Sequence, residues 1–81
     1  MNYVFAIGTI IEEVDFNFLF DDNAISISTS SIILPNNSII NIKGYDNIAD
    51  FMYSHLKINS KILVHGFISN NSIVIKNIYL L

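Results

Sequence analysis

The sequence contains no cysteine, no tryptophan and no arginine, and these absences limit the possible function. Without cysteine, no disulfide bond can stabilise the fold and no thiolate can hold a metal ion. Without arginine, the four basic residues are all lysines, and seven acidic residues outnumber them to give a net charge of −3. That charge argues against strong non-specific attraction to phosphate.

Long apolar runs are absent as well. No run approaches the roughly 18 apolar residues of a membrane-spanning helix, so we expect no membrane segment. No basic leader precedes the first predicted strand, so we expect no targeting segment. Isoleucine, asparagine and serine are abundant while proline and glycine are scarce, as in the translation of an AT-rich gene. This bias suggests a location in the plastid (the chloroplast stroma) or in the cytoplasm of an AT-rich bacterium.

The 81 residues are 52% hydrophobic and only 14% charged. A chain of this length makes one domain, spanning residues 1–81. It is too apolar for disorder and poor in charge for a soluble monomer. A domain of this size buries only about 60% of its unfolded surface. We therefore expect additional burial between copies, in a homo-oligomer.

Apolar spacing predicts five strands, at residues 3–13, 24–30, 39–45, 61–69 and 72–80. We interpret residues 15–20 as a bent extension of the first strand, followed by a turn at 21–23. Gly8 suggests a bulge or bend within the first strand, and Asn70–Asn71 predicts a tight hairpin turn.

Two of these strands carry a clear inside–outside pattern. In the second, isoleucines alternate with serines that we expect to lie on the exposed, ligand-binding face: Ser26, Ser28 and Ser30. In the fourth, three apolar residues are expected to face inward: Ile62, Val64 and Ile68.

One segment has helical spacing instead. Apolar residues from Ile48 to Leu56 predict an amphipathic helix from Asn47 to about Lys57, with Asp46 as its N-cap. The helix then falls between strands 3 and 4, which is the element order of an OB-fold. The sequence predicts an all-β fold with one helix, a five-stranded OB-fold barrel; another small α+β sheet remains the alternative.

The helix and the strand after it resemble those of bacterial single-stranded DNA-binding proteins. The similarity runs through residues 48–57 and 60–66, with Asp50 where that family has a glutamate and His65 where it usually has an acidic residue before Gly66. Residues 2–8 are similar to that family's first strand. The short chain also resembles primosomal replication protein N, a dimeric relative, and the composition suggests a plastid-encoded member.

This resemblance implies a ligand and its site. In that family, single-stranded DNA crosses the outer face of the second and third strands, with bases stacked on aromatic rings. By resemblance, Tyr45 would stack a base while Lys43 and Asn41 contact the backbone. Ile39 stands where the family has a tryptophan.

A second surface is predicted on the strand at 61–69. Leu63, His65 and Phe67 project outward, and apolar residues exposed in a row commonly mark a contact surface. The corresponding strand in the family contributes to subunit association, so we predict an oligomer interface here. Alternatively, Phe16 and Phe18 of the same chain cover these residues.

We expect no enzyme. The serines have no histidine and acid partner at a convincing spacing, and His55 is better explained by the helix end on which it lies. A carboxylate metal site is conceivable among the acidic residues after the first strand, but solvated turn residues explain them better, so we predict no metal site and no cofactor: Glu12, Glu13, Asp15, Asp21 and Asp22.

The predicted function is therefore binding of single-stranded DNA during DNA replication or maintenance. Two alternatives remain: binding of RNA by the same face, or a protein-interaction subunit that no longer binds nucleic acid. A positive groove through Lys43 would favour nucleic acid, and a negative face around Tyr45 would favour a protein partner.

Overall fold

The computed structural model describes residues 2–20 and 24–81; the turn predicted at 21–23 lies outside them. The described residues form six strands and one helix: β1 (Tyr3–Ile10), β2 (Asp15–Phe20), β3 (Ala24–Ile33), β4 (Ile39–Tyr45), α1 (Asn47–His55), β5 (Lys61–Ser69) and β6 (Ser72–Leu80). Among these residues, no helix is both long enough and apolar enough to cross a membrane.

The prediction of five strands was wrong, because residues 15–20 form a strand of their own. β1 ends at Ile10 rather than at Glu13, and β2 then pairs with β3 from Asp15↔Thr29 to Phe20↔Ala24. β1 pairs mainly with β5, so the chain changes its partner strand between β1 and β2. With this extra strand, the helix lies between β4 and β5 and not between the third and fourth strands.

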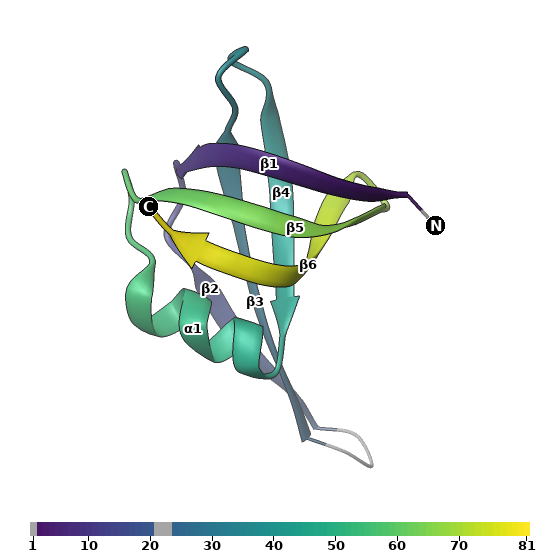
Figure 1. Ribbon diagram of the computed structural model, residues 1–81. Helices are drawn as coiled ribbons and strands as arrows, with labels where there is room; N and C mark the ends of the chain where they lie inside the picture. Colours follow the sequence, from purple (N-terminus) through teal and green to yellow (C-terminus); the bar gives the residue numbers. More distant parts are fainter. Residues whose placement is uncertain (1, 21–23) are drawn as a thin grey trace.

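The strands form one sheet in the order β1-β5-β6-β4-β3-β2, and a further pairing of β1 with β3 closes it into a barrel. Neighbouring strands are antiparallel except β4 and β6, which are parallel. Figure 1 shows α1 lying across one end of the curved sheet. The loop between β3 and β4 projects beyond the opposite end.

The core lies inside this barrel and under the helix. Among the described residues, it consists of nine apolar side chains that are almost fully removed from solvent: Ile10, Ile32, Ile42, Met52, Leu56, Ile62, Val64, Ile73 and Ile75. The inward orientation predicted for Ile62 and Val64 is confirmed. That predicted for Ile68 is wrong: the side chain, close to the β5–β6 turn, is 52% exposed.

The three alternating serines of β3, Ser26, Ser28 and Ser30, face inward, which contradicts the sequence-based prediction. Ser28 donates a hydrogen bond to the Ala49 carbonyl at 2.8 Å, and Ser30 donates to the Glu12 carbonyl at 2.8 Å. Ser26 is buried as well. The helix and the β1–β2 connection lie so close to β3 that small side chains fit there, and each hydroxyl satisfies a carbonyl. The alternating isoleucines therefore turn outward.

Gly66, rather than Gly8, marks the irregular point of the barrel. The β1–β5 register runs unbroken through Gly8↔Ile62, so the bulge predicted at Gly8 is absent from this ladder. The β5–β6 register shifts between His65 and Gly66 instead. A Cβ atom on Gly66 would overlap the Val74 carbonyl, so this close approach of two strands requires glycine.

Local turn chemistry explains the ends of the elements. Asn70 and Asn71 have φ of 51° and 63°, the left-handed values of a tight hairpin, as predicted. Asp46 is the N-cap residue as predicted, but its side chain makes no capping hydrogen bond. Its backbone N–H donates to the Ser26 carbonyl instead. The helix ends before Leu56, which is extended, so the predicted end near Lys57 was slightly too late.

Candidate nucleic-acid interface

The four side chains predicted to bind nucleic acid lie on one face of β4. Ile39, Asn41, Lys43 and Tyr45 alternate with residues that face the barrel interior, and Ile39 and Tyr45 are both exposed. Tyr45 is 39% exposed at the end of the strand, so part of the residue is open to solvent. The structure thus brings these residues together on the outer surface.

Strand pairing adds residues that sequence reasoning missed. The outward residues of β3 lie opposite those of β4, with Ile27 beside Tyr45 and Thr29 beside Lys43. We define the β3–β4 face as Ile27, Thr29, Ser31, Ile39, Asn41, Lys43 and Tyr45. The sequence signal for the β3 residues was present in the alternation of this strand, but its two faces were assigned the wrong way round.

Asn41 is held in a defined orientation. The Ser31 hydroxyl donates to Asn41 Oδ1 at 2.8 Å. Ser31 itself is almost completely buried, so it forms a fixed support. With Oδ1 occupied, the amide nitrogen of Asn41 is available as an outward donor. Beside it, Lys43 contributes an ammonium group on the same strand. β4 thus presents a lysine two residues before a tyrosine ring and an amide donor four residues before it. Such groups suit a nucleotide, which has acceptor oxygens and a flat base.

A hollow of about 320 Å³ lies beside Lys43 and Asn41. Its other wall includes three carboxylate side chains from the β1–β2 connection and the start of β2: Glu12, Glu13 and Asp15. Three acidic groups therefore share this hollow with one ammonium group. The surface at Lys43 is not the positive groove that would favour nucleic acid, and the carboxylates oppose a phosphate placed here.

A second notable surface covers β1 and β5. We define the aromatic face as Tyr3, Phe5 and Ile7 of β1 with their cross-strand neighbours Phe67, His65 and Leu63 of β5. The three β1 side chains are exposed, and Phe5 most of all, at 72%. The predicted outward orientation of the three β5 residues agrees with their partial exposure, which alternates with buried neighbours.

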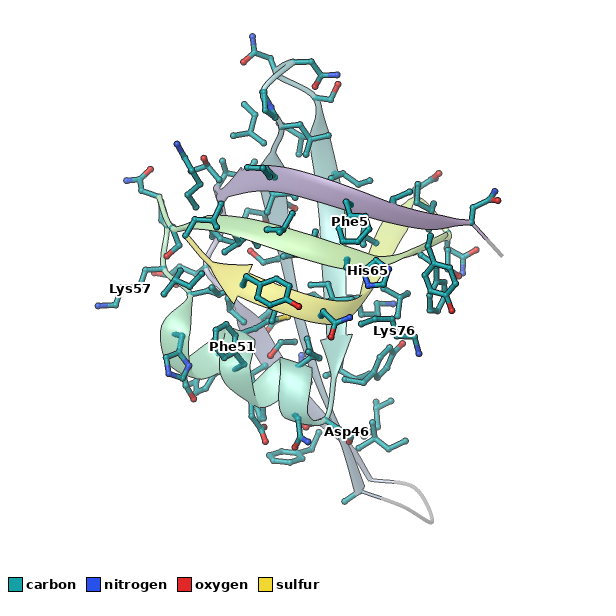
Figure 2. The ribbon with its side chains drawn as sticks, in the orientation of Figure 1. Phe5, Asp46, Phe51, Lys57, His65 and Lys76 are labelled. Carbon is teal, nitrogen blue, oxygen red and sulfur yellow. The ribbon has the colours of Figure 1, made fainter. Side chains whose placement is uncertain are left out.

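The rings of the aromatic face contact one another. The His65 ring stacks on Phe5, with centroids 4.5 Å apart and planes 17° apart, and its centroid lies 5.5 Å from that of Tyr3. Lys76 of β6 places Nζ 5.5 Å from the centre of the Phe67 ring. Figure 2 shows Phe5 and His65 adjacent on neighbouring strands, with Lys76 nearby. Exposed apolar groups of this kind are typical of contact surfaces.

The alternative that residues 16–18 cover the aromatic face is wrong. Phe16 lies on β2 at the far end of the sheet order and packs against Tyr53 of α1, with centroids 4.9 Å apart. Phe18 contacts the Phe16 ring edge-on at 5.1 Å. Phe16 therefore connects β2 to the helix, and Phe18 packs against Phe16.

The two histidines are separate. His55 lies at the end of α1, where its ring stacks on Phe51 at 4.6 Å, while His65 lies in β5. Within residues 2–20 and 24–81, no group of three or more histidine, cysteine, aspartate or glutamate side chains is placed to hold a metal ion.

Comparison with known proteins places the fold. No model of a known protein family matches the sequence, and no curated protein matches it. Solved structures do match. The SSB domain of a Synechococcus sp. protein has a TM-score of 0.85 at 14% identity, over 98% of this chain and 94% of that one. A small single-stranded DNA-binding protein from Streptomyces coelicolor has a TM-score of 0.72 at 12% identity, over 99% of this chain and 92% of that one.

A longer protein also matches. A deletion mutant of the single-stranded DNA binding protein from Thermus aquaticus has a TM-score of 0.88 at 11% identity. The alignment covers all of this chain but 41% of the Thermus chain. At these identities the likeness establishes the fold: the chain has the OB-fold architecture of single-stranded DNA-binding proteins, mostly β with one helix.

Proposed function

We propose that this protein binds single-stranded DNA on its β3–β4 face and acts in DNA replication or maintenance. One observation carries the proposal: on a fold shared with single-stranded DNA-binding proteins, Tyr45, Lys43 and Asn41 lie on one outer face. In the proposed complex, a base stacks on Tyr45, which contributes about 1–3 kcal/mol. Lys43 and the Asn41 amide then contact the sugar-phosphate backbone.

The charges on this face set the strength of the proposed binding. Glu12, Glu13 and Asp15 share the hollow with Lys43, so a DNA strand that follows the hollow meets net negative charge. Stacking and hydrogen bonding therefore supply most of the affinity. Each phosphate contacted contributes about −0.7 to the slope of log affinity against log salt, and with a single lysine on the face we expect a shallow slope.

We further propose that two copies associate through the aromatic face. Within the described residues, the 3–8 segment of β1 pairs with β5 along one edge, and its other edge has no strand partner. An unpaired edge that carries exposed apolar side chains favours antiparallel pairing with another strand. A second copy of β1 supplies both the strand and a matching apolar surface. Two weak sites on one assembly then share a DNA strand and gain affinity.

One observation supports a different function. The three carboxylates beside Lys43 suit a protein-interaction subunit that does not bind nucleic acid. Titration of a labelled oligothymidine with the purified protein, followed by fluorescence anisotropy at low and moderate salt, separates the two. Saturable binding supports the DNA proposal, and no binding by folded protein at low salt refutes it. An oligouridine of equal length distinguishes DNA from RNA. The plastid location stays a prediction from composition.

A further inference from the structure

His65 occupies the middle of the aromatic face, where it pairs with Phe5 across the β1–β5 ladder. Its ring lies against two β1 side chains, stacked on Phe5 and tilted toward Tyr3. On the other side, β6 contributes Asn77, whose register partner is His65. The imidazole is therefore the one ring of the described aromatic face that can gain a positive charge near neutral pH.

His65 has an uncharged polar partner in β6. Asn77 Nδ2 lies 3.0 Å from His65 Nδ1. In this orientation the amide nitrogen donates and Nδ1 accepts, so the proton of a neutral imidazole lies on Nε2. The amide of Asn77 carries no charge, so it gives an imidazolium at this position no ion-pair partner.

The surroundings of His65 offer no compensating negative charge. The titratable groups that neighbouring strands bring to this side are Tyr3 from β1 and Lys76 and Tyr79 from β6. None of the residues in β1, β5 or β6 is acidic. Lys76 carries the same sign as an imidazolium. Burying a charge without a partner is unfavourable, so covering this face disfavours a charged His65.

We infer that association of two copies through the aromatic face is proton-linked, with His65 as the group that must be neutral. The inference rests on the association proposed above. Covering the face disfavours the imidazolium, so association releases protons. Association therefore weakens as the pH falls through the range in which histidine becomes charged. Each covered histidine changes the dissociation constant by up to about tenfold per pH unit, so a symmetric pair changes it by up to about 100-fold.

Sedimentation equilibrium of the whole protein from about pH 8 to about pH 5.5 tests this linkage, with circular dichroism recorded on the same samples. We expect the dissociation constant of the wild type to rise at least tenfold as the pH falls, while the β-sheet spectrum is retained. His65→Gln and His65→Phe should remove this dependence. His55→Gln is the matched control, because His55 also stacks on a phenylalanine but lies on α1, and it should keep the dependence.

Contradictory outcomes separate the two proposals. A wild type that is monomeric at every pH refutes association, and the linkage with it. An oligomer whose dissociation constant does not change with pH, or changes equally in both His65 variants, refutes the linkage alone. Unfolding at the pH of dissociation also refutes the linkage.

Discussion

Ser28 and Ala49 are joined by a 2.8 Å hydrogen bond from the serine hydroxyl to the helix carbonyl, and this bond ties β3 to α1. Ser28 is completely buried, so no water replaces its hydroxyl. We expect Ser28→Ala to lower the free energy of unfolding by about 1–2 kcal/mol, measured by urea denaturation. Ser69→Ala, at an exposed serine, should change it by less than about 0.5 kcal/mol. Equal effects would contradict the role of Ser28.

The same serine shows where sequence reasoning failed. The alternation of β3 was recognised, and hydrophobicity then assigned isoleucine to the interior and serine to the surface. In the folded protein the opposite holds, because α1 and the β1–β2 connection leave room only for small side chains on the inner face. Periodicity gives the two faces of a strand, whereas the neighbouring elements decide which face is buried.

Local patterns predicted well what depends on nearby residues. The bounds of β4, the start of α1 and the turn at Asn70–Asn71 all follow from apolar spacing and turn chemistry. Long-range pairing could not be predicted in this way. The separation of β2 from β1 and the bulge at Gly66 exist because of partner strands that are distant in sequence. The carboxylates beside Lys43 likewise required the three-dimensional fold.

Removing acidic groups from the hollow should strengthen DNA binding. Replacing Glu12 and Glu13 together by glutamine deletes two carboxylates near Lys43 while keeping side-chain size. At low salt we expect the affinity for an oligothymidine to rise about two- to fivefold, and the gain to fade as salt screens the charges. Asp50→Asn removes an acidic group on α1 and serves as the control. An unchanged or weaker affinity in the double variant would mean that the DNA strand does not pass along this hollow.

Placing a charge on the aromatic face should prevent association. Phe5 is 72% exposed, so Phe5→Lys is tolerated by the single copy, and lysine on a strand edge disfavours pairing with another strand. We expect sedimentation at about pH 8 to give the mass of one copy for this variant and a larger mass for the wild type. Tyr53→Lys, at an exposed position of α1, should keep the larger mass. If both variants sediment with the mass of one copy, the aromatic face is not shown to be the interface.

The central claim is that single-stranded DNA stacks on Tyr45. Its most direct test is the affinity of wild type, Tyr45→Ala and Tyr53→Ala for one labelled oligothymidine at low salt, measured by fluorescence anisotropy. Tyr53 is the matched control, an exposed tyrosine on α1. The account predicts that Tyr45→Ala weakens binding about 5- to 150-fold, as loss of one stacked base requires, while Tyr53→Ala binds like the wild type. Equal affinity of all three proteins, or no binding by any of them, would contradict it.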